Sequence, residues 1–390
     1  MSNQFPSMII LGATGSVGRQ AADVAIQHGV QVDALSANKS VLETEKMVRM
    51  LAPKACAMAD EQSARDLAVR ISDLSVKVYA GQQGICEMIA ETQPTCDRQV
   101  VVNSILGQAG LSPTIATLQS GKQLALANKE SLVVAGEIVM PLAKQQGIDI
   151  LPVDSEHCAI YQCLRSGDRK EIRRIMLTAS GGPFYGYSRE QLQGVTKKHT
   201  LAHPTWNMGA KITVDSATMM NKGFEVIEAR WLFDIPVEKI QVLVHPQSVV
   251  HSAVQFVDGS VKAQLGTPDM RMPIQYALTY PERWQSDVPR LDLFATQNLT
   301  FEEPDLQRFP NLTLAYEAMN RGGNMPCVLN AANEVVNQAF RDGKCGFLQM
   351  SDVIANTMER TTFIAEPSYE DYVQTDKEAR TLAMKLLKLF

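Results

Sequence analysis

The chain has 390 residues, of which 45% are hydrophobic and 20% are charged, and its formal net charge is −5 at pH 7. A chain of this length and composition can bury more than one core, so we expect two or three domains. The charges are interspersed without a basic block, which argues against nucleic acid or an anionic membrane surface as the main partner.

Seven cysteines are scattered along the chain without a C-x-x-C pair. An odd and dispersed set of cysteines is typical of free thiols in a reducing compartment. No apolar run approaches the roughly 18 residues of a membrane span. The first strand is expected to begin near Ser7, which leaves no room for a leader peptide. We therefore expect a cytoplasmic protein without a membrane partner.

The first predicted strand, residues 7–12, leads into a glycine-rich turn and then a helix. Gly12, Gly15 and Gly18 would let the backbone turn sharply, approach a pyrophosphate and pack the helix on the sheet. The N-terminus of the helix would supply N–H donors for the phosphates. The spacing differs from the G-x-G-x-x-G of dinucleotide-binding proteins, but the strand-turn-helix context favours nucleotide binding over a merely structural turn.

A second predicted strand, residues 30–36, is followed by Asn38, Lys39 and Ser40. A cation beside small hydrogen-bonding groups suits the 2′-phosphate of NADPH, whereas an acid at this tip would favour NAD. Asp33 could be that acid, but it lies inside the strand and away from its carboxyl end. We interpret Asp33 as a solvated strand residue and expect NADPH as the cofactor.

Further apolar runs alternate with helical stretches up to residue 153, which predicts a Rossmann-like parallel sheet with helices on both faces. These runs cover residues 55–59, 76–79, 100–103, 123–127 and 148–153. Ligands of such sheets bind at the carboxyl ends of the strands. Lys129 follows one run and could be a snorkelling surface residue. Its place at a strand tip, near acids, favours a substrate contact instead.

Residues 154–293 predict a second domain of α+β construction with a mostly antiparallel sheet. Its strands are expected at residues 173–179, 239–245, 248–256 and 261–265, with a tight turn at Asp258 and Gly259. A long loop, residues 199–209, contains Trp206 and Met208, so we interpret it as a lid that closes over a ligand. The alternative is that Trp206 packs on the core.

Three carboxylates of this domain predict a metal site. Asp154 and Glu156 are two residues apart, and in an extended segment both would point to the same side. Glu225 is four residues after Asn221, so both would share one face of a helix. Oxygen ligands suit Mg²⁺ or Mn²⁺ better than zinc. The structural alternative is that the acids are solvated surface charges.

A second polar group predicts a phosphate site, because it combines hydroxyls, an amide and one cation. Its members are Ser180, Ser216, Asn221 and Lys222, and His203 could join them from the lid. Asp215 or Ser216 is expected to cap the helix that carries Asn221. The remaining histidines considered have no acids at ligand spacing and are interpreted as structural: His28, His245 and His251.

Residues 294–311 contain two prolines without periodicity and predict a linker. Beyond it, residues 312–390 predict a C-terminal helical bundle with a structural role. Asn330, Asn333 and Glu334 are expected to be capping or interhelical groups in this bundle.

Seven motifs in this chain resemble, in the same order, those of the 1-deoxy-D-xylulose 5-phosphate reductoisomerase family. They lie at residues 12–18, 127–131, 152–157, 179–184, 203–209, 215–225 and 329–334. The resemblance implies that an NADPH-binding domain, residues 1–153, precedes a catalytic domain that binds Mn²⁺ or Mg²⁺. It also implies a homodimer. Family members often have glycine, a basic residue and asparagine after the second strand, whereas this chain has Asn38, Lys39 and Ser40.

The resemblance also implies roles for individual residues. The implied metal ligands are Asp154, Glu156 and Glu225, which are catalytic together with Lys129. The implied substrate contacts are Lys129, Ser155, Glu156, Ser180, His203, Trp206, Met208, Ser216, Asn221, Lys222 and Glu225. The implied cofactor contacts are Thr14, Gly15, Ser16, Val17, Asn38, Lys39, Ser40, Asn128, Glu130 and Gly209.

The implied reaction rearranges the carbon skeleton of 1-deoxy-D-xylulose 5-phosphate, by retro-aldol cleavage and re-addition or by a 1,2-shift. Reduction by NADPH then gives 2-C-methyl-D-erythritol 4-phosphate, an isoprenoid precursor of the non-mevalonate pathway. Two alternatives use parts of the same pattern. One is a metal-dependent NADP hydroxy-acid dehydrogenase without skeletal rearrangement, and the other is a non-enzymatic NADPH-sensing module.

Overall fold

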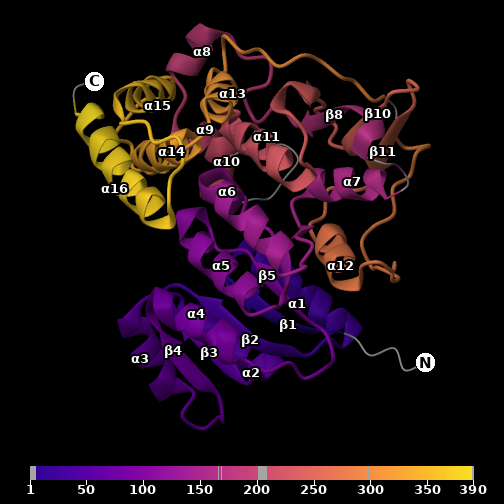
Figure 1. Ribbon diagram of the computed structural model, residues 1–390, viewed down its shortest axis with the longest axis vertical. Helices are drawn as coiled ribbons and strands as arrows, with labels where there is room; N and C mark the ends of the chain where they lie inside the picture. The colour runs from indigo at the N-terminus through magenta and orange to yellow at the C-terminus, as the bar shows by residue number, and fades with distance from the viewer. Residues whose placement is uncertain (1–5, 166, 168, 201–208, 297, 389–390) are drawn as a thin grey trace. The chain divides into compact units, whose positions relative to one another are not determined.

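The computed structural model describes residues 6–165, 167, 169–200, 209–296 and 298–388, and Figure 1 labels its elements. The chain divides into two compact units. Unit 1 comprises Met1–Ser131, Val139–Cys158 and Asp269–Val288, and unit 2 comprises Leu132–Ile138, Ala159–Pro268 and Pro289–Phe390. Each unit therefore contains segments that are distant in the sequence.

Unit 1 is built on a seven-stranded sheet in which every strand pair is parallel, with the order β4-β3-β2-β1-β5-β6-β7. The strands are β1 (Ser7–Leu11), β2 (Val32–Ala37), β3 (Ala55–Met58), β4 (Lys77–Ala80), β5 (Gln99–Asn103), β6 (Gln123–Leu126) and β7 (Leu151–Pro152). The predicted parallel sheet is confirmed, although its last strand is much shorter than the predicted run of residues 148–153.

Helices connect successive strands of this sheet, as parallel pairing requires. They are α1 (Ser16–His28), α2 (Val41–Leu51), α3 (Glu61–Arg70), α4 (Gly81–Glu91), α5 (Leu111–Gln119) and α6 (Glu130–Gln145), with a 3-10 turn at Gly107–Gly110. A further helix, α12 (Arg271–Thr279), packs on α1, and the His28 Nε2 and Gln275 Oε1 atoms lie 2.9 Å apart. This bond and the edge contact with Trp284 confirm His28 as a structural residue.

The strand order reverses between β1 and β5, because the chain builds outward from β1 to β4 and then returns to place β5 beside β1. Leu11 and Asn103 are register partners at the carboxyl ends of these two strands. The hydroxyl of Ser104 donates to the Leu11 carbonyl at 2.6 Å, which holds the two exits together. Such a reversal leaves a crevice at the carboxyl ends, where α/β proteins bind their ligands.

The prediction that Asp33 is a solvated strand residue is wrong. Its side chain is fully buried and accepts hydrogen bonds from the Gln99 amide at 2.5 Å and from Thr95. Burial by itself raises the pKa of Asp33, but these hydrogen bonds outweigh it and hold the pKa below its ordinary value. The alternation of Asp33 with apolar neighbours suggested that one face of β2 is exposed to solvent. Both faces of a central parallel strand are covered, however, so this side chain is buried.

Unit 2 contains a four-stranded mixed sheet with the order β11-β10-β8-β9. Its strands are β8 (Ile172–Ala179), β9 (Ile240–Val244), β10 (Val250–Phe256) and β11 (Val261–Leu265). Only β8 and β9 pair in parallel, so the prediction of a mostly antiparallel sheet is confirmed. The predicted turn is present, with Gly259 at φ +88° and Asp258 accepting from the backbone N–H of Ser260 at 2.9 Å.

Helices make up the rest of unit 2. Helix α7 (Ser155–Leu164) precedes β8, and its first residues belong to unit 1. Between β8 and β9 lie α8 (Arg189–Gln193), α9 (Lys197–Thr200), α10 (Ala210–Ala217) and α11 (Met220–Phe233). The C-terminal bundle comprises α13 (Asn311–Arg321), α14 (Met325–Arg341), α15 (Gln349–Arg360) and α16 (Tyr369–Leu386). Glu334 of α14 pairs with Arg380 of α16 at 2.7 Å, which confirms its predicted interhelical role.

Apart from Asn311, where α13 begins, the segment predicted to be a linker forms no helix or longer strand in its described residues, but it contacts the sheet. Val244 at the end of β9 pairs with Glu302 in an isolated antiparallel bridge. The ring of His245 stacks on Phe301, and its Nε2 atom accepts from the backbone N–H of Val250 at 3.1 Å. His245 is therefore structural, as predicted.

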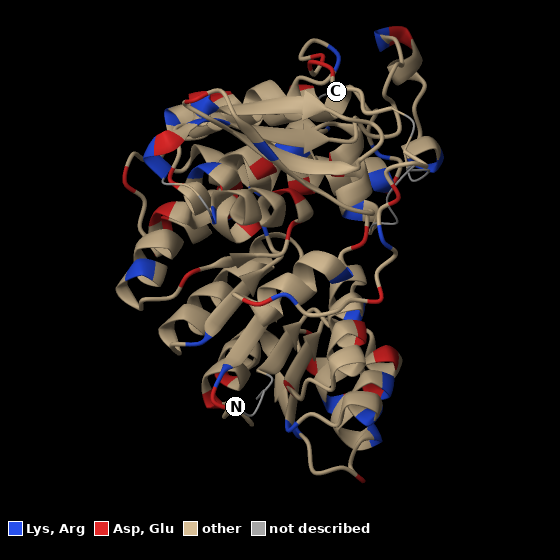
Figure 2. Ribbon diagram, turned by 90° about the vertical axis from the view of Figure 1, so that its right-hand side faces the viewer, with Lys and Arg blue, Asp and Glu red and all other residues tan. Residues whose placement is uncertain are grey.

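Three properties agree with the composition. Figure 2 shows Lys and Arg residues interspersed with Asp and Glu residues along the ribbon. Among the described residues, no helix combines the length and the apolar character needed to cross a membrane. All seven cysteines are free thiols.

Candidate functional site

The glycine turn after β1 is tight and leaves no room for side chains at Gly12 and Gly18. Gly12 has φ +77°, and a Cβ atom there would lie 2.9 Å from the backbone oxygen of Ser104. A Cβ atom at Gly18 would lie 2.6 Å from the Cα atom of Ala13 and still closer to the Gly12 carbonyl oxygen. Gly15 is exposed at the start of α1, where backbone N–H groups are available to an anion.

The segment after β2 lies beside this turn. The hydroxyl oxygens of Thr14 and Ser40 are 2.9 Å apart, which joins the turn to the tip of β2. Asn38 is exposed, and the Lys39 side chain is 72% exposed with its Nζ atom 3.8 Å from Asp60. Lys39 thus places an exposed cation beside the turn, where the 2′-phosphate of NADPH is predicted to bind.

Asn128, after β6, is almost fully buried. Its side-chain amide donates to the carbonyl of Ile105 at 2.7 Å and lies 3.0 Å from the carboxylate of Glu130. Its side-chain oxygen accepts from the backbone N–H of Ser131 at 3.0 Å. Asn128 therefore holds the start of α6 in place, and a direct contact with the cofactor stays a prediction.

Lys129 and Asp154 form an ion pair at the carboxyl edge of the same sheet. The Lys129 Nζ and Asp154 Oδ2 atoms are 2.5 Å apart, and the two side chains are only 10% and 14% exposed. The Nδ1 atom of buried His157 lies 3.9 Å from the same oxygen. The low-dielectric surroundings strengthen this pairing, and the catalytic role of Lys129 stays a prediction.

The prediction that Asp154 and Glu156 belong to an extended segment is wrong. The carbonyl of Asp154 accepts from the backbone N–H of Cys158 at 2.8 Å, which closes the first turn of α7. Glu156 lies in that turn, where the helix dipole favours an acid. The Ser155 hydroxyl donates to the Glu156 carboxylate at 2.5 Å.

In unit 2, Glu225 is the centre of a buried polar group on α11. Its side chain is 1% exposed and forms an ion pair with Lys222, which is 4% exposed. The Asn221 amide donates to the other carboxylate oxygen of Glu225 at 2.5 Å. The predicted sharing of one helix face by Asn221 and Glu225 is therefore confirmed.

Ser180 and Ser216 belong to two segments that touch within unit 2. The Ser180 hydroxyl accepts from the backbone N–H of Gly182 at 3.2 Å. Gly182 has φ +70°, and a Cβ atom there would lie 2.9 Å from the backbone oxygen of Ser216. The loop after β8 thus depends on a glycine to lie against the end of α10.

Neither Asp215 nor Ser216 caps the helix that carries Asn221, contrary to the prediction. Both lie inside α10, and α11 begins after Met219, which has φ +62°. The Asp215 carboxylate accepts from the amides of Asn333 and Asn337 at 2.8 Å each. Sequence reasoning missed this group, although the spacing of buried asparagines along α14 was the signal that could have revealed it.

Three predicted lid residues, His203, Trp206 and Met208, lie outside the described residues. Gly209, which follows them, is exposed immediately before α10. Of the predicted site residues that are described, unit 1 brings the glycine turn, the β2 tip, Lys129 and Asp154 to one edge of its sheet. Unit 2 holds Ser180, Ser216 and the group around Glu225.

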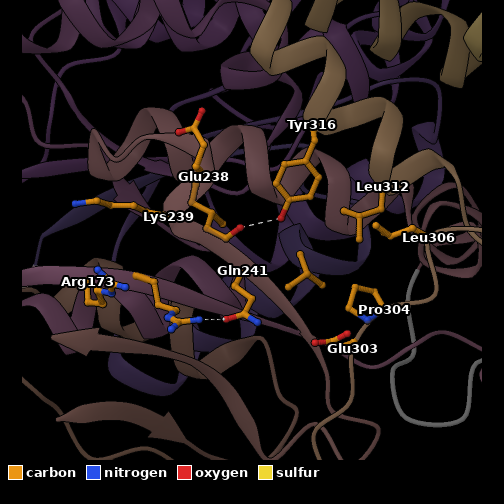
Figure 3. Close-up of a pocket in the computed structure, with 12 residues that line it drawn as sticks. Arg173, Glu238, Lys239, Gln241, Glu303, Pro304, Leu306, Leu312 and Tyr316 are labelled. Carbon is orange, nitrogen blue, oxygen red and sulfur yellow. Dashed lines mark hydrogen bonds between the residues drawn. The ribbon is translucent and has the colours of Figure 1, made fainter. Parts of the chain in front are cut away.

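A cavity of about 640 Å³ in unit 2 is lined by none of the predicted site residues. It lies beside the first residues of β8 and β9, whereas Ser180 follows the last residue of β8. Figure 3 shows Tyr316 and Gln241 among the lining residues. The hydroxyl of Tyr316 donates to the backbone carbonyl of Ile240 at 2.8 Å, and Arg174 donates to the side-chain oxygen of Gln241 at 2.7 Å. These polar groups are already paired with the protein.

Three family models match this chain, and all describe the same enzyme. Residues 8–136 match the model "1-deoxy-D-xylulose 5-phosphate reductoisomerase", residues 150–233 match its C-terminal domain model, and residues 265–382 match the "DXP reductoisomerase C-terminal domain". The 1-deoxy-D-xylulose 5-phosphate reductoisomerase of Phocaeicola vulgatus is 56% identical over 380 residues, which cover 97% of this chain and 98% of the relative.

Solved structures give the same result. The reductoisomerase from Zymomonas mobilis in complex with NADPH has a TM-score of 0.91 and 42% identity, and the match covers 99% of this chain and 100% of that one. A DOX-P reductoisomerase in complex with NADPH, fosmidomycin and magnesium has a TM-score of 0.92 and 39% identity, with 98% of each chain covered. The resemblance inferred from the motifs is confirmed. The chain therefore belongs to the 1-deoxy-D-xylulose 5-phosphate reductoisomerase family.

Proposed function

We propose that this protein converts 1-deoxy-D-xylulose 5-phosphate to 2-C-methyl-D-erythritol 4-phosphate with NADPH and a divalent cation. The observation that carries the proposal is the carboxyl edge of the unit 1 sheet. A phosphate-binding glycine turn follows β1 there, and the buried Lys129–Asp154 pair stands after β6 and β7. Membership of the family supplies the reaction that uses these parts together.

The residues around the glycine turn fit NADPH. Thr14, Gly15, Ser16 and Val17 lie at the start of α1, where the dipole and the free N–H groups favour a pyrophosphate. The Cβ positions of Gly12 and Gly18 are blocked by backbone atoms, so this tight turn excludes larger residues. Asn38, Lys39 and Ser40 offer one cation and polar groups to the 2′-phosphate, and Asn128, Glu130 and Gly209 complete the proposed contacts.

The acids fit a hard divalent cation. Asp154, Glu156 and Glu225 offer carboxylate oxygens only, which is the donor chemistry that Mg²⁺ and Mn²⁺ prefer. Lys129 orients Asp154, and Asn221 with Lys222 orients Glu225, so two of the three carboxylates are held before a cation arrives.

When bound, the cation polarises the substrate's ketone and neighbouring hydroxyl, and NADPH supplies the reducing equivalents. Lys129 stabilises negative charge on the substrate oxygen nearest to it. Ser180, Ser216, Asn221 and Lys222 hold the phosphate, and this remote binding energy orients the reacting carbons. Ser155, between Asp154 and Glu156 in the sequence, contacts the substrate.

The proposal extends to a homodimer that works in the cytoplasm. Strand β11 is an edge strand of the unit 2 sheet, and its Val261 and Leu265 side chains are 52% and 37% exposed. Exposed apolar groups on an unprotected edge are a liability unless another chain covers them. Light scattering during gel filtration tests the dimer, and fractionation of cells tests the compartment.

The central experiment measures NADPH oxidation with 1-deoxy-D-xylulose 5-phosphate, with and without Mn²⁺ after chelation. We expect NADPH oxidation only when both the substrate and Mn²⁺ are present. The branched product should form in an amount equal to the NADPH consumed. Oxidation with an unbranched product would indicate the hydroxy-acid dehydrogenase alternative. NADPH binding without any oxidation or Mn²⁺ binding would indicate a sensing module.

A further inference from the structure

The polar group around Asp215 is a buried feature to which the proposed reaction assigns no role. Asp215 is 1% exposed and lies in α10, which packs on α14 in unit 2 (Figure 1). One carboxylate oxygen accepts from Asn333 and Asn337 at 2.8 Å each, and the other lies 3.1 Å from the Nζ atom of Lys211. Asn337 also donates to the backbone carbonyl of Lys211 at 2.9 Å. Both turns of α10 are thus bonded to α14.

The bonds of this group constrain how α10 packs on α14. A buried ion pair contributes little to stability compared with apolar residues of the same size, because both charges lose their hydration. Its bonds are directional, however, and they admit one position of α10 along α14. The Nζ atom of Lys211 also lies 5.4 Å from the ring centroid of Phe224, which ties the same group to α11.

The residue next to Asp215 is Ser216, and successive residues of a helix point about 100° apart. While Asp215 faces α14, the backbone of Ser216 faces the loop of Gly182 and Ser180. The carbonyl of Ser216 accepts from Met219 at 3.1 Å, immediately before α11 begins. The position of α10 therefore sets where Ser216 lies relative to Ser180 and to the first turn of α11.

We propose that Asp215, held by Asn333 and Asn337, is a positioning residue that places Ser216 for the substrate's phosphate. The C-terminal bundle thereby contributes to substrate binding without touching the substrate. This inference rests on the proposed function, since it takes Ser216 to be a phosphate contact.

The test compares Asn333→Ala with a matched control, Asn330→Ala. Both asparagines are fully buried in α14, but the Asn330 amide donates to Glu334 at 3.2 Å instead of to Asp215. For Asn333→Ala we expect the KM for 1-deoxy-D-xylulose 5-phosphate to rise at least fivefold. The inhibition constant of inorganic phosphate should rise by the same factor, while the KM for NADPH stays within twofold. Asn330→Ala should leave all three values within twofold of wild type.

A purely structural role makes a different prediction, namely loss of thermal stability with an unchanged phosphate inhibition constant. That result, or an equal rise in the KM for NADPH, would overturn the proposal. Asn337→Ala is the second variant if Asn333→Ala does not fold, since it leaves the Asn333 bond in place. In Asn337→Ala, a rise in the inhibition constant of inorganic phosphate without a rise in the KM for NADPH supports the proposal. The absence of that rise refutes it. If the wild-type protein fails to oxidise NADPH with this substrate, the proposed function fails instead.

Discussion

Replacing Gly18 with alanine tests the glycine turn most directly. The new Cβ atom would lie 2.6 Å from the Cα atom of Ala13, whereas ordinary contacts begin near 3.4 Å. Helix α1 and the turn must therefore separate by at least about 0.8 Å, since the Gly12 carbonyl oxygen is closer still and both obstructing groups are backbone. A shift of this size misaligns the N–H groups of the first turn of α1 with a pyrophosphate.

The expected loss follows from hydrogen-bond energies. Losing one or two hydrogen bonds to a charged group, at about 1.5–3 kcal/mol each, costs roughly 3 kcal/mol in total. Since about 1.4 kcal/mol is a factor of ten, the Kd for NADPH should rise by about two orders of magnitude. Overpacking should also lower the free energy of unfolding by about 1–3 kcal/mol.

The assay is fluorescence titration of NADPH with the folded variant, checked by circular dichroism. Gly346→Ala is the control, because a Cβ atom there meets nothing within 4 Å and its φ is not positive. We expect the control to bind NADPH like the wild type. A Gly18→Ala protein that is folded and binds NADPH within threefold of wild type would refute the reasoning.

Three further predictions concern other residues. Glu225→Gln or Asp154→Asn should reduce turnover below about 1% of the wild-type value while the Kd for NADPH changes less than twofold. The reason is that the carboxylates bind the cation and the glycine turn binds the nucleotide. Normal turnover with a retained metal requirement would contradict the ligand assignment. Lys39→Ala should raise the KM for NADPH about five- to tenfold and leave that for NADH unchanged; equal changes for both cofactors would exclude a 2′-phosphate contact. The folded-state pKa of Asp33 is lowered, so its contribution to stability is present above the unfolded pKa of about 3.9 and is lost as pH falls through the folded pKa. The difference in unfolding free energy between wild type and Asp33→Asn should thus be constant from about pH 5 to 8 and shrink below about pH 4; growth of that difference on acidification would show that the pKa direction is wrong.

Local sequence patterns were sufficient to predict the glycine turn after β1 and the position of Lys129 at the end of a strand. A strand, three glycines and an amphipathic helix are adjacent in the sequence, so the turn after β1 could be predicted from neighbouring residues alone. Lys129 could be placed near a ligand because strand tips of a parallel sheet share one edge. The order of the strands could not be predicted, since it depends on pairing between distant segments.

Two of the failed predictions, those for Asp33 and Asp215, have the same physical cause: the bonding partners lie far away in the chain. Asp33 looked solvated because its donors Thr95 and Gln99 come from segments about sixty residues later. Asp215 looked like a cap because its partners belong to α14. The prediction that Asp154 lies in an extended segment failed for a local reason. Its carbonyl accepts the first hydrogen bond of α7, at a point where the strand was expected to continue.

The place of α12 in the chain has a consequence for biosynthesis. Unit 1 includes Asp269–Val288, so the helix that covers α1 is translated about 110 residues after Cys158. At about 5–20 residues per second, the nucleotide-binding sheet waits roughly 5–20 s on the ribosome for its last helix. During that interval the face of α1 around His28 lacks Gln275 and Trp284. A fragment that ends at residue 153 would keep this face uncovered permanently, which makes it a poor substitute for the complete chain in NADPH-binding studies.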